Sequence, residues 1–435
     1  MRGPRRSACL LLGLCAAASV ADAPAQVAGE PVAVAQLTGG FGFNIDLSRL
    51  LSSSVEIEPG ELLILWHGAE ESKDGLRWMK DRYQLDPVQV DVLDALGLIL
   101  AQFKTGSPSA QDIKAQLRRE QPTWVVDLNT RNVLLADPGG LPAASMPRLY
   151  ALGQLGLSPT AVDPPRAFRL GVADTAFELT TRLHVGRLVV RDMLEGADVP
   201  APVDHGTAIA RLIAGAPQPN GFSGVSRGFE LFWARTVRMV DGQPRSNTAL
   251  MSRAVGWLAD QGVDAINISQ GGPGDDILKE VFARLTARSI LMVAAAGNGG
   301  PRAGPVFPAA YPGVLAVTAI DAQAHIYAQA NQGSYVALAA PGVDVWVPAT
   351  TADQEGGQAR GGQYLSGTSF ASALVAGSLA HADAALWGVP SSARIARLCS
   401  GARDLGEPGR DPVFGCGLLR LTEEPGPTLT GASTK

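Results

Sequence analysis

The sequence has few charged residues and no long basic run. Charged residues make up 18% of the 435 residues, below the roughly 25% of an average soluble domain. The net charge of −5 argues against nucleic acid as a principal partner. The 50 glycines follow no strict period, which excludes a collagen-like fibre. Apolar residues make up 46%, so the chain can bury a sizeable core and wholesale disorder is excluded.

Long hydrophobic runs are also missing. Beyond the N-terminus no stretch reaches about 18 consecutive apolar residues, so we expect no membrane partner. At the N-terminus, Arg2, Arg5 and Arg6 precede an apolar stretch over residues 8–20 that is too short to span a bilayer comfortably. This pattern predicts a signal peptide over residues 1–25, with a buried helix as the alternative. We therefore expect export to the periplasm or to the outside of the cell.

Cysteine is scarce. Of the four cysteines, Cys9 and Cys15 lie within the predicted signal peptide. Cys399 and Cys416 remain, an even number in an exported protein. We predict a disulfide between them, and two free buried thiols are the alternative.

Changes in composition divide the rest of the chain. Residues 26–54 are small and polar and are predicted to form a linker or irregular arm. Residues 55–135 show the order β-α-β-β-α-β, which is typical of a ferredoxin-like α+β domain. Residues 136–165 are rich in proline, glycine and alanine and indicate a linker and processing region. Residues 166–422 form the second domain, and residues 423–435 a disordered tail.

The second domain has the pattern of a parallel α/β sheet. Its apolar runs are near-continuous, as in strands buried on both faces, and they alternate with helix-like segments. The strand-like runs are residues 188–190, 265–268, 290–296 and 314–320, and the helix-like segments are residues 248–261 and 277–287. We expect three layers, with helices on both faces of the sheet.

Four polar residues lie at positions where α/β proteins commonly have functional residues, namely after a strand or at the start of a helix. Asp174 and Asn298 each follow an apolar strand, at the carboxyl edge where α/β proteins build sites. His205 opens a helical run in the sequence Asp-His-Gly-Thr, and Ser369 begins a helix of small residues after Gly367. A serine there has free N–H groups and the positive end of the helix dipole beside it. Taken singly, each residue is equally well explained as a cap, a turn or a chance match.

The combination is far more specific than its parts. Asp, His and Ser occur in the chain order of subtilisin, which differs from the chymotrypsin and α/β-hydrolase orders. Together with further landmarks, this order makes residues 169–422 resemble the subtilisin-like serine peptidases, or subtilases. The landmarks are residues 267–272, 307–312, 339–342, 402–406 and 415–417. The 55–135 unit similarly resembles a subtilase propeptide, although more in its fold than in its motifs.

The resemblance implies a role for each of these residues. Ser369 would be the nucleophile, His205 its general base, and Asp174 the group that orients His205 and stabilises its cationic form. Asn298 and the Ser369 N–H would bind the oxyanion. The implied protein is an exported, monomeric serine endopeptidase that is made as a zymogen. It would act on polypeptides, with its own propeptide as an intramolecular inhibitor.

The resemblance also implies a binding pocket. Its walls would be two short segments of small, mostly uncharged residues, which favour a medium or large apolar side chain. These residues are Ser269, Gln270 and Gly271 in one segment and Ala295, Ala296 and Gly297 in the other. Calcium is common in the family, but the sequence shows no acidic ligand loop, and we assign neither a metal nor another cofactor.

Four residues depart from the usual family pattern. Ala176 and Arg211 stand where glycine is usual, Ala373 replaces a proline, and Phe370 replaces a common methionine. None of these changes removes a nucleophile, a base or an oxyanion donor. Ala176 would strain the backbone only at a positive φ, and Arg211 would obstruct packing unless it points to solvent.

Two other functions fit the same residues. A subtilase fold without catalytic activity could serve as a binding protein, although all four site residues are retained. An esterase or other acyl hydrolase could use the same chemistry, but the serine lacks the Gly-x-Ser-x-Gly elbow.

Overall fold

The computed structural model describes residues 55–135, 150–157, 164–218, 222–348 and 362–421. The predicted signal peptide, the arm over residues 26–54 and the C-terminal tail lie outside the described residues. None of the helices in the described ranges is long and apolar enough to cross a bilayer.

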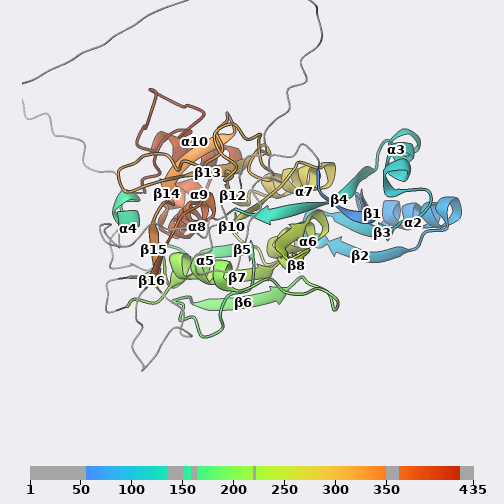
Figure 1. Cartoon of the computed structure of the whole chain (residues 1–435), viewed down its shortest axis with the longest axis horizontal. Helices are drawn as coiled ribbons and strands as arrows, with labels where there is room; N and C mark the ends of the chain where they lie inside the picture. Colours follow the sequence, from blue (N-terminus) through green and yellow to red (C-terminus); the bar gives the residue numbers. More distant parts are fainter. Residues whose placement is uncertain (1–54, 136–149, 158–163, 219–221, 349–361, 422–435) are drawn as a thin grey trace, which may run out of the picture. The chain divides into compact units, whose positions relative to one another are not determined.

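The second domain contains the predicted parallel sheet. All six strand pairings of this seven-stranded sheet are parallel (Figure 1). In spatial order the strands are β14 (Val336–Pro341), β13 (Val314–Ile320), β12 (Leu291–Ala295), β10 (Ala265–Ile268), β5 (Arg169–Asp174), β7 (Glu230–Arg235) and β6 (Arg187–Asp192). The three-layer α/β fold expected from the sequence is confirmed.

Alternate residues of these strands face two separate cores. On β12, Leu291 and Val293 pack with α5 (Asp204–Ala214) and α8 (Thr368–Ser378). Met292 and Ala294 pack on the opposite face, with α6 (Thr248–Asp260) and α7 (Asp276–Ala287). Because successive side chains of a strand point to opposite faces, a strand buried on both faces has to be apolar at nearly every position.

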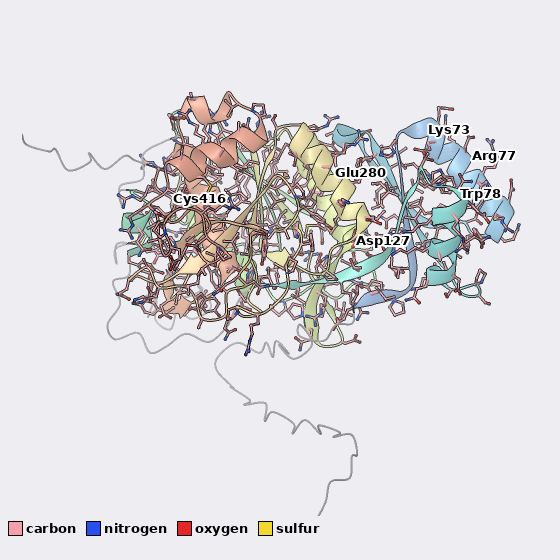
Figure 2. All side chains as sticks on the ribbon, turned by 90° about the horizontal axis from the view of Figure 1, so that it is seen from above. Lys73, Arg77, Trp78, Asp127, Glu280 and Cys416 are labelled. Carbon is pink, nitrogen blue, oxygen red and sulfur yellow. A yellow bond between two sulfur atoms is a disulfide. The ribbon has the colours of Figure 1, made fainter. Side chains whose placement is uncertain are left out.

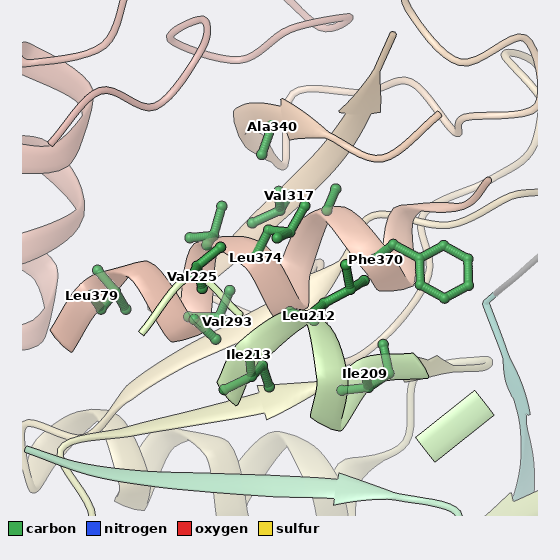
Figure 3. Close-up of a cluster of buried hydrophobic side chains, with 14 of the residues drawn as sticks. Ile209, Leu212, Ile213, Val225, Val293, Val317, Ala340, Phe370, Leu374 and Leu379 are labelled. Carbon is green, nitrogen blue, oxygen red and sulfur yellow. The ribbon is translucent and has the colours of Figure 1, made fainter. Parts of the chain in front are cut away.

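Helices α5 and α8 lie close together over the sheet. Figure 3 shows Ile213 of α5 and Leu374 of α8 in one cluster with Val293 and Val317 of the sheet. A Cβ atom on Gly377 would lie 2.6 Å from a methyl carbon of Val225 and 3.3 Å from the Cα of Ile213. The small residues of α8 therefore allow the close approach of α5.

Shorter elements complete this domain. They are η3 (Leu379–His381), α9 (Ala384–Trp387), α10 (Ser391–Ser400), and the antiparallel pair β15 (Val345–Pro348) and β16 (Gly362–Leu365). Cys399 of α10 is joined to Cys416 in a disulfide, with the two Cα atoms 5.2 Å apart.

The first domain has the predicted β-α-β-β-α-β order. Its elements are β1 (Ile57–Trp66), α2 (Ala69–Tyr83), β2 (Pro87–Leu93), η1 (Asp94–Leu96), β3 (Leu98–Lys104), α3 (Ala110–Glu120) and β4 (Val125–Leu134). The strands form an antiparallel sheet in the order β2-β3-β1-β4. Ser109 and Asp112 form a capping box at the start of α3.

Tryptophans fill the core between this sheet and its helices. The Trp66 ring centroid lies 5.4 Å from that of Trp124, which lies 5.5 Å from that of Trp78. Trp78 is on α2 and is labelled in Figure 2. A Cβ atom on Gly75 would lie 2.4 Å from the Trp66 ring. Glycine in mid-helix, usually destabilising, is therefore required here to admit the indole ring.

The antiparallel sheet continues into the second domain. Strand β4 also pairs with β9 (Gln243–Asn247), which pairs with β8 (Arg238–Val240), and the end of β4 pairs with β11 (Gln270–Gly271). Leucines on the face of the sheet opposite α2 and α3 share one buried cluster with α6 and α7. Strand β4 is thus common to both domains.

Part of the predicted linker is folded. Within residues 136–165, α4 (Tyr150–Gln154) packs on the second domain. The Tyr150 hydroxyl donates to the Val343 carbonyl oxygen at 2.5 Å, and Leu155 is fully buried. Prolines and glycines lie on both sides of this short apolar segment. The composition of residues 136–165 as a whole therefore predicted a linker and did not reveal the helix. Residues 136–149 and 158–163 lie outside the described residues.

Candidate active site

Asp174 and His205 form a buried pair. Asp174 is the last residue of β5 and is fully buried, and its Oδ1 lies 2.7 Å from Nδ1 of His205. The same oxygen accepts the Thr175 N–H at 2.7 Å. Nε2 of His205 is buried and has no hydrogen-bond partner in the described part of the chain. One imidazole nitrogen is therefore held by the carboxylate, and the other is free to take a proton.

The glycine after His205 brings the two residues together. The Gly206 N–H donates to the Thr175 hydroxyl at 2.8 Å. A Cβ atom on Gly206 would lie only 2.4 Å from the Ala176 carbonyl oxygen. A side chain at this position would push α5 away from the segment that follows β5. The Gly in His-Gly-Thr is thus a packing requirement of the site.

Ser369 lies at the first turn of α8, where the backbone turns at Gly367 with φ of 151°. It is fully buried, and its hydroxyl donates to the carbonyl oxygens of Leu135 and Ser269, the latter at 3.1 Å. The next residue, Phe370, places its ring centroid 5.9 Å from that of His205. The serine and the histidine therefore lie in the same region, although the hydroxyl bonds to Leu135 rather than to the imidazole.

Asn298 presents an unpaired donor to this region. Its Oδ1 accepts the N–H and the hydroxyl of Thr368, at 3.1 and 2.8 Å. Its Nδ2 is buried and has no hydrogen-bond partner among the described residues. The preceding residue, Gly297, has φ of 113°, and a Cβ atom there would lie 2.7 Å from Asn331. Only glycine fits this turn, which directs the Asn298 amide.

The end of β4 occupies the site as an extended strand. The Leu135 carbonyl oxygen accepts the Ser369 N–H at 3.1 Å, in addition to the serine hydroxyl. The Leu135 N–H donates to the Ser269 carbonyl oxygen at 3.0 Å, and β4 pairs antiparallel with β11. A peptide carbonyl group thus lies against both the serine hydroxyl and a backbone donor. Leu135 is also the residue at which the sequence predicts the end of the first domain, directly before the predicted processing region.

The Leu135 side chain identifies the pocket. It is 2% exposed and shares a buried cluster with Ala295 and Val306. A Cβ atom on Gly271 would lie 2.5 Å from a Val306 methyl carbon and 2.9 Å from a Leu135 methyl carbon. Gly271, expected from the sequence, therefore adjoins this side chain, and Ala295 belongs to the same buried cluster. Val306 was missed, because nothing in its spacing distinguishes it from other buried valines.

Three other residues expected to line the pocket, Ser269, Gln270 and Ala296, make different kinds of contact. Ser269 and Gln270 contact the β4 segment through their backbones. The Gln270 side chain instead donates to the Ala173 carbonyl oxygen at 3.1 Å and to the Thr236 hydroxyl at 2.6 Å, so it belongs to the sheet. Ala296 is buried, and its carbonyl oxygen accepts the Tyr335 hydroxyl at 2.7 Å.

A buried carboxylate lies where β4 meets α6 and α7. Asp275 caps α7 by accepting the Leu278 N–H at 2.7 Å. It also accepts the hydroxyls of Thr248 and Thr130, at 2.7 and 2.9 Å. Burial raises the pKa of Asp275 to about 6. Sequence reasoning missed this residue, since an aspartate before a helix is usually a solvated cap.

The structure shows how the fold accommodates Arg211 and Ala176, two of the four residues that differ from the usual family pattern. Arg211 does not point to solvent: it is buried, donates to the Pro348 carbonyl oxygen at 2.7 Å and pairs with Glu178 at 3.4 Å. The expectation that a buried arginine would obstruct packing is therefore wrong, because its charge and its donors find partners. Ala176 is not among the residues with positive φ, so it causes no strain.

Metal ligands do not gather near this site. Within the described ranges, no group of three or more His, Cys, Asp and Glu side chains is arranged to hold a metal ion.

Comparison with known proteins gives the family. The profile of the subtilase family matches residues 170–417, more than half of the chain. The protein belongs to the subtilase family, as its sequence motifs predicted.

Individual relatives agree with this assignment. Subtilisin DY of Bacillus licheniformis is 30% identical over 223 residues, which cover 50% of this chain and 76% of the relative. A probable subtilase-type serine protease of Deinococcus radiodurans is 33% identical over 204 residues, covering 43% of this chain and 27% of the relative. This chain thus spans well under two thirds of the Deinococcus protein.

A solved structure shares the fold. Fervidolysin from Fervidobacterium pennivorans, described as a keratinolytic enzyme related to subtilisin, superposes with a TM-score of 0.66 at 20% identity. The match covers 84% of this chain and 60% of that chain.

Proposed function

We propose that the protein is an exported serine endopeptidase made as a zymogen, with Asp174, His205 and Ser369 as its catalytic triad. One observation carries the proposal: the Leu135 carbonyl group lies against the Ser369 hydroxyl and accepts the Ser369 N–H at 3.1 Å. A peptide carbonyl group thus lies beside the nucleophile and is held by a backbone donor, and for attack the hydroxyl would turn its proton from this oxygen to His205 Nε2. Nε2 of His205 and Nδ2 of Asn298, which have no hydrogen-bond partner among the described residues, would supply the general base and the second oxyanion donor.

The mechanism follows from these groups. His205 Nε2 takes the Ser369 hydroxyl proton as Oγ bonds to the carbonyl carbon, and Asp174 stabilises the resulting imidazolium. The Ser369 N–H and Asn298 Nδ2 hold the oxyanion of the tetrahedral intermediate. When the C–N bond breaks, His205 returns the proton to the leaving amine and an acyl ester remains on Ser369. Water, deprotonated by His205, hydrolyses this ester and frees the serine.

We further propose that residues 55–135 are the propeptide and that the Leu135–Ala136 bond is its processing site. Polar groups of β4 cap both helices beneath the propeptide. Asp127 accepts the Asp276 N–H of α7 at 3.0 Å, and Asn129 accepts the Ala249 N–H of α6 at 3.1 Å. These contacts support an inhibitor that folds against the enzyme and keeps its C-terminal strand in the substrate position.

N-terminal sequencing of secreted protein tests this proposal. Wild-type protein should yield a mature chain that begins at Ala136, or at a later residue after further trimming. Ser369→Ala should remain uncut. Processing of the Ser369→Ala variant in a host that lacks other peptidases would overturn autocatalysis, and recovery of residues 1–25 on secreted protein would overturn the signal peptide.

The two alternative functions give different results. A fluorophosphonate probe should label wild-type protein and not Ser369→Ala, whereas a fold used only for binding would label neither. An esterase would label but would hydrolyse esters and leave peptides intact. The purified 55–135 segment should inhibit the mature enzyme at micromolar concentration, and failure to do so would overturn the propeptide assignment.

A further inference from the structure

We propose that this site selects leucine at P2, the substrate residue before the one whose carbonyl is attacked, and that Ala201, Val237 and Met239 are the side chains that select it. The inference rests on the proposed function, in which Leu135 is the P1 residue. The structure then places Leu134 at P2. It extends specificity beyond the pocket expected from the sequence, to residues that no motif pointed out.

Leu134 is buried apart from Leu135. It is 7% exposed and forms a cluster of its own with Ala201, Val237 and the partly buried Met239. Leu135 belongs instead to the large cluster that contains Ala295. Consecutive residues of an extended strand point to opposite sides, so the P1 and P2 side chains enter two different pockets.

Backbone hydrogen bonds build the walls of the P2 pocket. Two segments run antiparallel to each other, 199–201 before α5 and 237–239 around the start of β8. The Met239 N–H donates to the Val199 carbonyl oxygen at 2.7 Å, and the Ala201 N–H to the Val237 carbonyl oxygen at 3.3 Å. None of these bonds involves Leu134, so the pocket keeps its shape when another substrate replaces β4.

The chemistry of this pocket explains the preference. The three side chains that cluster with Leu134 are Ala201, Val237 and Met239, and they offer neither a charge nor a strong hydrogen-bonding group. A polar or charged P2 side chain would lose its water there without gaining a partner from these three residues, which is unfavourable. An alanine would leave the space of three carbon atoms unfilled, whereas leucine fills it as Leu134 does. Because hydrophobic pockets discriminate about 10–200-fold for small changes in side-chain size, we expect a Leu-to-Ala change at P2 to lower kcat/KM about 10–100-fold.

Fluorogenic peptides test the preference without altering the enzyme. The parent peptide carries Asn-Val-Leu-Leu-Ala-Asp, the sequence of residues 132–137. Self-processed enzyme should cleave it between Leu and Ala about 10–100-fold faster, in kcat/KM, than peptides with Ala or Asp at P2. Valine to alanine at P3 serves as the matched substrate control, because Val133 is only half-buried and should matter less.

Variants of the pocket locate the preference. Val237→Ala enlarges the pocket and should raise kcat/KM for a phenylalanine at P2 relative to leucine by about tenfold. Met239→Ala, at a partly buried position, should reduce the preference for Leu over Ala without a change in folding. Val190→Ala on β6 is the matched control, since Val190 is 51% exposed and should leave both ratios unchanged.

The possible outcomes separate the two levels of the proposal. Cleavage of the Leu and Ala peptides at equal kcat/KM would overturn the P2 inference and leave the peptidase function standing. A clear preference for Leu over Ala at P2 that is the same in wild type, Val237→Ala and Met239→Ala would also overturn it, because other residues would then determine the preference. Absence of both peptide cleavage and fluorophosphonate labelling would overturn the proposed function and this inference with it.

Discussion

The side-chain oxygen of Asn298 accepts both the N–H and the hydroxyl of Thr368, at 3.1 and 2.8 Å. Two donors on one atom fix which end of the amide is the oxygen, since an NH₂ group could accept neither hydrogen bond. The NH₂ group is therefore the end of the amide that makes no hydrogen bond within the described part of the chain. Thr368 also accepts the Gly297 N–H at 3.2 Å, so a single residue braces the turn that carries Asn298.

Loss of the Asn298 amide should slow turnover much more than it weakens binding. Asn298→Leu removes a donor to the oxyanion but no ground-state hydrogen bond to substrate. Loss of one such donor in a subtilisin lowers kcat by about 10²–10³, and we expect a similar effect here. Steady-state kinetics on one peptide should show a nearly unchanged KM. A kcat within tenfold of wild type would exclude Asn298 from the oxyanion site.

Replacement of either Ser369 or His205 by alanine should abolish nearly all peptidase activity and leave the fold intact. In the proposed mechanism Ser369 supplies the bond to the substrate and His205 the proton transfer. Circular dichroism and thermal unfolding of each variant provide the control for folding. Activity within tenfold of wild type in either folded variant would refute the triad assignment.

Asn132→Leu should strengthen inhibition by the propeptide. Asn132 lies three residues before Leu135, is 1% exposed, and neither its Oδ1 nor its Nδ2 has a partner among the described residues. Burying such unpaired polar groups costs about 1–3 kcal/mol, which an apolar side chain of similar size avoids. The lag before peptidase activity appears should lengthen about tenfold. Val88→Ala, at an exposed position of β2, should leave the lag unchanged, and a shorter lag for Asn132→Leu would contradict the argument.

Asp275→Asn should remove a pH dependence from the stability of the precursor. Burial raises the pKa of Asp275 from 3.8 to about 6 in the folded state. Between these values the folded state holds a proton that the unfolded state releases, so stability falls as pH rises from about 4 to 6. The loss is about 3 kcal/mol by this arithmetic, and it is constant at higher pH. Asparagine stays neutral and should not show this loss.

Denaturant unfolding of uncut protein provides the measurement. Ser369→Ala and the double variant Ser369→Ala, Asp275→Asn should differ in the slope of unfolding free energy against pH between about 4 and 6, and run in parallel above it. Equal slopes in this range would show that Asp275 titrates at its ordinary value in the folded protein.

The Cys399–Cys416 disulfide should stabilise the folded protein. It closes a loop with a sequence separation of 17 residues, for which chain entropy alone gives about 3 kcal/mol, a model-dependent figure. Non-reducing peptide mapping should recover the two cysteines in one linked fragment, and Cys399→Ser should lower the unfolding free energy. Recovery of both as free thiols would leave them as packed core residues.

Much of this fold could be predicted from the sequence because its strands are buried on both faces. The runs at β10 and β13 are apolar except for Asn267 and Thr318, and their predicted ends match the observed ones. Segment α4 was missed for the opposite reason: its few apolar residues stand between proline-rich stretches, and only contacts such as Tyr150 to Val343 reveal that it packs on the second domain.

In the candidate site, too, the sequence could point to some residues and not to others. Asp174, His205, Asn298 and Ser369 could be proposed from the sequence because their chain order and motifs together resemble those of the subtilases, and the structure places them at the end of β5, in α5, after β12 and in α8. Val237 and Asp275 could not, because their importance comes from partners far along the chain, Leu134 and Thr130. Periodicity and motif spacing carry no information about such partners.

The sharing of β4 between two domains has a consequence for the timing of activation. A cut after Leu135 would break one covalent bond but none of the hydrogen bonds between β4 and β1, β9 or β11. Before the cut, the first domain docks on the second as part of the same chain. After the cut, the two are separate molecules, so the fraction of enzyme that has propeptide bound depends on their concentration. Activity would then appear on dilution rather than at the moment of the cut. Export into a large volume would itself be the switch.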